Sequence, residues 1–271
     1  MTLTKHLPRF RFLSQILFAL SALLPLQGAS GAVVFSDDFS DGSASNWRPG
    51  TAWTVINNDP TGEPSAASQW LYSTTTTDFN AIQSPNASGF TATVDAFTSV
   101  RFSTGIEFIT SMPNRIDLYL RTNNGNYNGG TASLDNAYGL KLTPGTGTAV
   151  RLAITKRVGG VESFIATAAA DITLTSATYY RTELTIGNGG AVTAAVYDAS
   201  GTLLSSVGAT DTSHTTFGSV VNALRTSSGS TGFRTSNFLV ETIAVPEPSV
   251  AFMAGLAPLL LMGWRRRRVS C

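Results

Sequence analysis

The sequence predicts an all-β protein, an antiparallel β-sandwich assembled from many short strands. Short runs of alternating apolar and polar residues recur between Val33 and Ile243, and clusters of Gly, Asn, Ser and Asp separate them. Helical periodicity is confined to the two ends of the chain, apart from one turn near residues 220–224. Many closely spaced strands without helices favour a sandwich or barrel, and the lack of a fixed repeat argues against a propeller or solenoid.

Individual strands are recognised by apolar residues at every second position. This alternation places one set of side chains on one face of a strand. It occurs in the segments 116–120, 150–154, 180–186 and 192–196. Gly187-Asn188-Gly189-Gly190 joins the last two segments, and because Gly and Asn tolerate positive φ, we expect a hairpin there. Asp198–Gly201 and Gly159-Gly160 are predicted to be further turns.

The start of this region carries a recognisable pattern. It contains Asp37-Asp38-Phe39-Ser40-Asp41-Gly42, then Trp47, then the strand Trp53-Thr54-Val55. This opening resembles that of the concanavalin A-like (laminin G-like) jelly-roll domains of secreted bacterial proteins. The resemblance implies that a final strand, Asn237–Ile243, pairs with the first strand. Relatives often have Asp before the Phe of that strand, whereas this chain has Asn237.

Residues 1–32 have the three parts of a secretory signal peptide. Lys5, Arg9 and Arg11 form a basic start, an apolar stretch runs from residue 12 to 26, and small residues follow. The alternative is a retained membrane anchor, which the short apolar run and the small-residue exit disfavour. We therefore expect export, with signal peptidase as a transient partner.

The other end of the chain combines a motif, an apolar segment and a basic cluster. Pro246-Glu247-Pro248 precedes an uncharged segment, 250–264, which is followed by Arg265, Arg266, Arg267 and Arg268. A helix of that length spans about 22 Å, less than the roughly 30 Å hydrocarbon core of a bilayer. The arginines are expected to stay on the cytoplasmic side, which leaves the preceding residues outside.

This arrangement resembles the PEP-CTERM sorting signal. The resemblance implies recognition of Pro246, Glu247 and Pro248 by an exosortase, in a Gram-negative bacterium that makes exopolysaccharide, and removal of the tail that follows. A plain tail anchor in the inner membrane is the alternative, and in that case too the protein would face outward. The expected location is the cell envelope, the cell surface or the extracellular matrix.

The division that follows is a signal peptide at 1–32, one β-sandwich domain at 33–244 and a sorting signal at 245–271. Without its terminal segments the body has 11 basic and 16 acidic residues, so it is about five charges negative. A nucleic-acid partner is therefore not expected, because binding to phosphates needs a basic face. The one cysteine, Cys271, lies in the tail, so the body holds no disulfide.

Catalytic motifs are missing from the body. Retaining glycoside hydrolysis needs two carboxyl groups about 5 Å apart, and strands supply them as closely spaced acids, whereas the glutamates here are isolated in sequence. No Gly-x-Ser-x-Gly or phosphate-binding loop occurs. The body has a single histidine, His214, which is predicted to be a surface residue rather than a zinc ligand. We expect a protein that is not an enzyme and has no cofactor other than, at most, Ca²⁺.

Two sets of residues are candidates for binding. Asp37, Asp38 and Asp41 could supply oxygen ligands to Ca²⁺, although acidic residues at a strand end also form turns. Trp70, Tyr72 and Tyr127 could contact a glycan, because aromatic rings stack on the apolar faces of sugars. Trp47 and Trp53 are expected in the core.

The sequence thus predicts an exported, non-enzymatic protein of the cell surface or exopolysaccharide matrix, either structural or glycan-binding. The alternative is an extracellular enzyme that acts on glycans through a site without a recognised motif.

Overall fold

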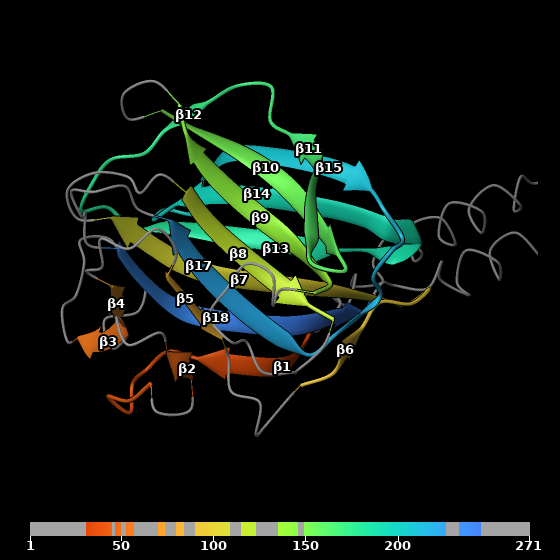
Figure 1. Cartoon of the computed structure of the whole chain (residues 1–271), viewed down its shortest axis with the longest axis horizontal. Coiled ribbons are helices and arrows are strands. Elements are labelled where there is room, and N and C mark those ends of the chain that lie inside the picture. Colours follow the sequence, from red (N-terminus) through yellow and green to blue (C-terminus); the bar gives the residue numbers. More distant parts are fainter. Residues whose placement is uncertain are drawn as a thin grey trace, which may run out of the picture. The chain divides into compact units, whose positions relative to one another are not determined.

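Two antiparallel sheets pack face to face in the computed structural model, which describes residues 31–44, 47–49, 53–56, 70–73, 80–83, 90–108, 115–122, 135–145, 149–225 and 233–244. We call them sheet A and sheet B, and Figure 1 shows their strands one over the other. Sheet A runs in the order β15 (Leu203–Thr210), β14 (Ala191–Asp198), β13 (Tyr180–Ile186), β7 (Thr98–Phe108), β18 (Phe233–Ala244), β4 (Trp70–Ser73) and β3 (Trp53–Ile56), with β1 (Ala32–Asp37) also paired to β18. The predicted all-β sandwich is confirmed.

Sheet B forms the second layer. Its order is β11 (Val161–Thr167), β10 (Ala149–Val158), β9 (Ala137–Pro144), β8 (Arg115–Arg121), β17 (Ser219–Arg225), β5 (Asn80–Gln83) and β2 (Arg48–Pro49), with β12 (Ile172–Thr173) beside β10. β16 (Thr216–Phe217) and β6 (Ala92–Thr93) make a separate small pair. The turn near 220–224 is a wrong prediction, because β17 covers it as a strand with Val220 and Val221 buried on opposite faces.

The predicted hairpin is confirmed. β13 and β14 pair from Tyr180–Asp198 to Ile186–Val192, and a short 3₁₀ turn, Asn188–Gly190, joins them. Gly189 and Gly190 have φ of 70° and 80°, the left-handed conformation that glycine adopts most readily. Gly159 and Gly160 make the β10–β11 turn in the same way.

Apolar side chains from alternate positions of both sheets fill the core. Phe102 and Leu184 from sheet A are at most 2% exposed, as are Leu118 and Leu140 from sheet B. Trp47 is 1% exposed, which confirms its predicted core position. Its ring lies 4.7 Å from that of Phe238 and 5.5 Å from that of Phe39. The aromatic contacts therefore hold the segment after β1 against the last strand.

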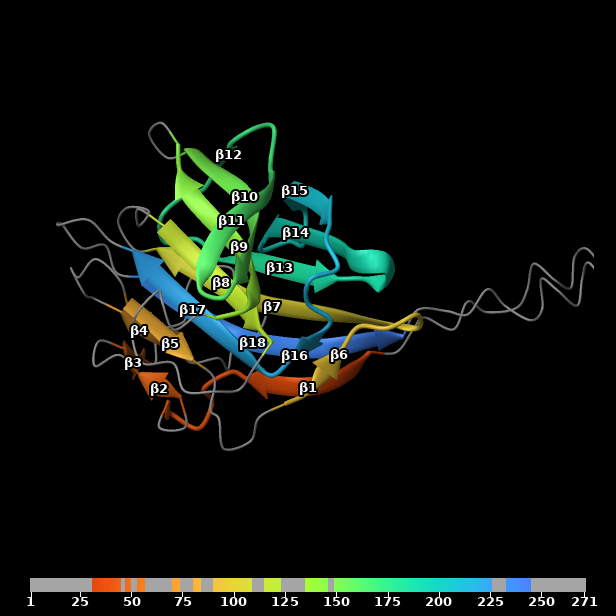
Figure 2. The ribbon, with the colours of Figure 1, turned by 45° about the vertical axis from the view of Figure 1, so that its right-hand side comes forward.

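The last strand pairs with the first, as predicted. β1 lies antiparallel to β18, with Ser36 opposite Leu239 and Asp37 opposite Phe238. In Figures 1 and 2 the orange-red β1 lies beside the blue β18 in both views. β18 is longer than the sequence suggested, and its other side pairs with β7 along most of its length.

A β-bulge interrupts the pairing of β18 with β7. The register moves from Ser236–Gly105 to Leu239–Ser103, so three steps on β18 oppose two on β7, and Asn237 has a φ of 51°. Buried hydroxyls satisfy the displaced backbone: Thr104 Oγ1 donates to the Ser236 carbonyl at 2.7 Å, and Thr235 Oγ1 donates to the Gly105 carbonyl at 3.1 Å.

No helix within the described ranges is long and apolar enough to cross a membrane. Residues 1–30 of the predicted signal peptide lie outside the described residues, and so does the whole sorting signal, 245–271, including Pro246, Glu247, Pro248 and the four arginines. These assignments stay predictions.

Replacing Thr104 with valine tests the support of the bulge. Thr104 is 1% exposed, so the change removes the buried hydroxyl that donates to the Ser236 carbonyl. We expect the free energy of unfolding to fall by about 1–3 kcal/mol in denaturant titrations. Thr193→Val, at an exposed position of β14, should change it by less than about 0.5 kcal/mol. Equal effects of the two changes would contradict this role of Thr104.

Candidate functional site

The outer face of sheet A, which points away from the core, carries polar side chains in adjacent strands. On β7 the core residues alternate with Arg101, Ser103 and Gly105, which therefore face outward. The register sets Ser103 between Glu183 of β13 and Leu239 of β18. Strand alternation and pairing thus bring residues far apart in sequence onto one surface.

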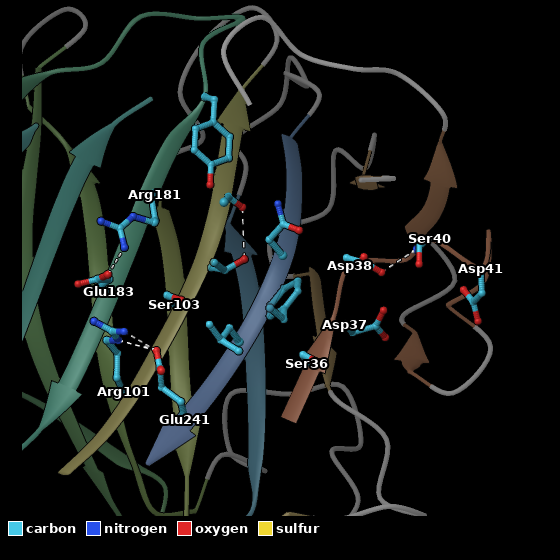
Figure 3. A pocket seen from close by; sticks show the side chains of 16 residues that line it. Ser36, Asp37, Asp38, Ser40, Asp41, Arg101, Ser103, Arg181, Glu183 and Glu241 are labelled. Carbon is cyan, nitrogen blue, oxygen red and sulfur yellow. Dashed lines mark hydrogen bonds and ion pairs between the residues drawn. The ribbon is translucent and has the colours of Figure 1, made fainter. Parts of the chain in front are cut away.

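An open groove of about 600 Å³ lies on this face. Figure 3 shows its labelled side chains: those of β13 and β7 lie on one side of β18, and those of β1 and the following turn lie on the other. The lining residues are Ser36, Asp37, Asp38, Ser40, Asp41, Arg101, Ser103, Thr104, Gly105, Tyr179, Arg181, Glu183, Asn237, Phe238, Leu239 and Glu241. We call this site the sheet A groove.

Both glutamates of the sheet A groove are held by arginines. Arg101 contacts Glu241 Oε1 through two nitrogens, at 2.7 and 2.5 Å, across the β7–β18 pair. Arg181 forms an ion pair with Glu183 on the same strand, and its guanidinium lies 4.3 Å from the centre of the Tyr197 ring. These contacts neutralise the two glutamates and fix their orientation.

Three aspartates form the β1 side of the sheet A groove, and each accepts hydrogen bonds from its own turn. Asp38 Oδ1 accepts the Ser40 amide at 3.0 Å, and Asp41 Oδ1 accepts the Ser43 amide at 2.9 Å. Hydrogen bonds from the Ser40 amide and hydroxyl lower the pKa of Asp38. No ion pair joins these aspartates to a cation among the described residues.

Asp37 has a structural role. Its Oδ1 accepts the Phe39 amide at 2.8 Å, and its Oδ2 accepts the buried Trp47 indole N–H at 2.5 Å. In the part of the chain that the structure describes, no group of three or more His, Cys, Asp or Glu residues is arranged to hold a metal ion. The three aspartates predicted as calcium ligands therefore line one groove without converging on one point.

Ser103 forms part of the groove floor. It is only 8% exposed, and its hydroxyl makes no hydrogen bond with any described residue. Beside it, Gly105 allows the Tyr179 ring to lie close to β7, because a Cβ there would be 2.5 Å from Tyr179 Cε2. A hydroxyl that opens onto a groove and has no hydrogen bond to a described residue is a candidate for bonding to a ligand.

The outer face of sheet B holds a second polar cluster, which is closed. It centres on Glu162, which forms ion pairs with Lys141, Arg115 and Arg157 and accepts the Tyr119 hydroxyl at 2.6 Å. Asp117 and Lys141 are 1% and 2% exposed. Burial raises the pKa of Asp117 to about 6, although Arg115 opposes the shift. These ion pairs connect β11 to β10, β9 and β8 within sheet B.

The other predicted binding residues are only partly described. β4 contains Trp70 and Tyr72, and Tyr72 is opposite Arg234 of β18, so both predicted residues belong to a strand that borders the groove strands. The side chains of Trp70 and Tyr72, and the whole of Tyr127, are not among the parts of the chain that the structure describes. No sequence motif singled out the other charged and hydroxyl residues of the groove, which are Arg101, Ser103, Arg181, Glu183 and Glu241. The alternation in 180–186 carried a signal, because it puts Arg181 and Glu183 together on the outer face.

His214 is not a surface residue, so that prediction is wrong. It is 7% exposed, and its Nε2 lies 2.8 Å from the Arg157 carbonyl. Its ring packs edge-on against Tyr138, with 5.0 Å between centroids. The polar loop that carries it is held against sheet B, since Lys156 contacts Asp211 at 2.5 Å, and this buries the imidazole.

No protein-family model matches the chain, and no curated protein matches its sequence. Solved structures are similar in fold. The Trypanosoma cruzi (T. cruzi) calreticulin globular domain has 12% identity and a TM-score of 0.52 over 77% of this chain and 87% of that one. The CBM2 module of the Lactobacillus casei BL23 phage J-1 evolved Dit has 13% identity and a TM-score of 0.51, over 80% of this chain and 98% of that one. The VIP36 exoplasmic/lumenal domain in its Ca²⁺/Man3GlcNAc-bound form has 11% identity and a TM-score of 0.50, over 77% of this chain and 87% of that one. At such identities, these similarities establish the sandwich fold alone.

Replacing Asp37 with alanine tests its structural role. The change removes the acceptor of the Trp47 indole, and we expect the free energy of unfolding to fall by about 2 kcal/mol because a buried N–H loses its partner. Asp95→Ala is the matched control, since Asp95 caps an exposed turn with one bond to the Phe97 amide. It should cost less than about 1 kcal/mol in the same denaturant titration. A smaller effect for Asp37 than for Asp95 would refute the role.

Proposed function

We propose that this chain is an exported, non-enzymatic glycan-binding protein with a concanavalin A-like sandwich, and that the sheet A groove is its binding site. The groove itself is the observation that carries this proposal. Its volume of about 600 Å³ is in the range of sites that hold ligands of a few sugar residues. Ordered polar groups line it, on a sheet whose packing keeps them in place.

The chemistry of the lining favours binding to hydroxyl groups. Ser36, Ser40 and Ser103 supply hydroxyls that can donate or accept, and the Arg–Glu pairs supply fixed donors and acceptors. Sugars are recognised through such placed polar groups, and a pre-ordered site loses little entropy on binding. The fold similarity to VIP36, whose compared structure contains Man3GlcNAc, supports the same class of ligand.

The carboxyl groups argue for binding without hydrolysis. A glycosidase needs a carboxyl group that stays protonated until it donates to the leaving oxygen. Among the described residues, Asp117 and Glu107 have pKa values raised by burial, and neither lines the groove. Each is at most 2% exposed and contacts an arginine. The groove glutamates are paired with arginines as well.

A binding screen with a linked hydrolysis assay tests this proposal. We expect the purified full-length protein to bind one class of glycan on an array and to leave the ligand intact. Ser103→Val should weaken binding at least about tenfold, because it removes the floor hydroxyl and adds bulk there. Thr193→Val, on the same face of sheet A but outside the groove, should bind like the wild type. Both variants should keep the wild-type unfolding midpoint within a few degrees.

Three results would separate the alternatives. Turnover of a glycan would favour the enzyme, and a lack of both binding and turnover would favour a purely structural role. If Ser103→Val binds the glycan as tightly as the wild type does, the binding site lies outside the sheet A groove. Running the screen with Ca²⁺ and with a chelator also tests the calcium prediction at Asp37, Asp38 and Asp41. If the melting temperature is the same in both conditions, that prediction is removed.

Export and sorting complete the proposal. The signal peptide and the Pro-Glu-Pro tail would deliver the body beyond the inner membrane, after processing by signal peptidase and an exosortase. The masses of the termini in the native cell test this route, and we expect a chain that lacks the first 30 or so residues and Arg265–Arg268. A native chain that keeps both ends would overturn the sorting proposal.

A further inference from the structure

We propose that the sheet A groove selects glycans with free amino groups, such as polymers of glucosamine, over neutral and acidic glycans. This inference rests on the proposed function and names the ligand class of the same site. It is carried by the distribution of charge across the groove and by the Ser103 hydroxyl on its floor, which opens onto the groove.

The charges of the lining do not cancel. Five carboxylates line the groove, at Asp37, Asp38, Asp41, Glu183 and Glu241, together with two cations, Arg101 and Arg181. The arginines pair with the two glutamates, which leaves the three aspartates. The excess negative charge therefore lies on the β1 side of the groove.

Among the described residues, no cation forms an ion pair with these three aspartates, so a cationic ligand group could compensate their charge. The only partners that the described residues offer them are N–H and hydroxyl groups of neighbouring residues, which leave their charge uncompensated. Asp38 and Asp41 are exposed, so a ligand can approach them from solvent. The negative charge of these aspartates attracts a protonated amine and repels a uronate carboxylate.

The floor gives a second, independent indication of a ligand. Ser103 is more than nine-tenths buried, lines the groove and has no hydrogen bond to a described residue. Its hydroxyl opens onto the groove, where it can donate a hydrogen bond to a ligand hydroxyl or accept one. The floor thus fits a polyhydroxylated ligand better than it fits a simple ion.

The spacing of strands connects the two features. Ser103 on β7 is opposite Leu239 on β18, which is opposite Ser36 on β1. Two strand spacings amount to about 10 Å. A glycan chain that bonds to Ser103 can therefore extend across β18 to β1, where an amino group on a later sugar residue would meet the aspartates. A chain of amino sugars satisfies both requirements at once.

The test compares three tetrasaccharides by calorimetry on the full-length protein. These are glucosamine tetramer, its N-acetylated counterpart and galacturonic acid tetramer, measured at mildly acidic pH where the amine is protonated. We expect the glucosamine tetramer to bind about tenfold more tightly than the N-acetylated form and to lose affinity as salt is raised, with no detectable binding of the galacturonate.

Isosteric variants locate the effect. Asp38→Asn and Asp41→Asn keep an oxygen for the turn and remove one charge each, so each should weaken glucosamine tetramer binding about threefold. Their affinity for the N-acetylated tetramer should not change. Asp95→Asn is the matched control, because Asp95 caps a similar exposed turn outside the groove, and it should bind like the wild type.

The outcomes distinguish this inference from the proposed function. Equal affinity for the glucosamine and N-acetylated tetramers would overturn the inference and leave glycan binding in the groove intact. Unchanged glucosamine binding in Asp38→Asn and Asp41→Asn would also overturn it. Calcium that competes with the amine in the wild type but not in Asp38→Asn would support the placement of the charge. Failure to bind any glycan, on these probes and on the array, would overturn the proposed function itself.

Discussion

The pairing of β18 with β7 on one side and with β1 on the other is the constraint on which the rest of the structure depends. β18 therefore lies between β7, a central strand of sheet A, and β1, the first strand of the domain. The bulge at Asn237 shifts the register by one residue, and the buried hydroxyls of Thr104 and Thr235 satisfy the backbone there. Without this arrangement the β1 side and the floor of the groove would not meet.

The same constraint orders the side chains of the site. Arg101 on β7 reaches Glu241, which is 140 residues later in the sequence, only because β18 lies beside β7. Asp37 anchors the first turn through Trp47, whose ring packs on Phe238 of β18. Core packing below the sheet and the polar surface above it are thus coupled through one strand. This coupling keeps the groove ordered, and an ordered groove would lower the entropic cost of binding the proposed ligand.

Turns and strand alternation could be predicted from the sequence, whereas the neighbours of each strand within the sheets could not. The glycine-rich turn at 187–190 and the alternation around it predicted the β13–β14 hairpin, because those signals act between adjacent residues. The aspartates of the groove were also found, although for a calcium site. The floor was missed because Ser103 becomes part of a site only when β13 and β18 flank β7. His214 was misplaced for the same reason, since residues of sheet B bury it.

Amide chemical-shift mapping with a bound glycan tests the central claim most directly, because it reports which face of the sandwich the ligand contacts. The groove site predicts that the largest shifts fall on the amides of Ser103, Gly105 and Asn237, with smaller ones along β1. Shifts confined to β8 and β9, on the outer face of sheet B, would contradict it.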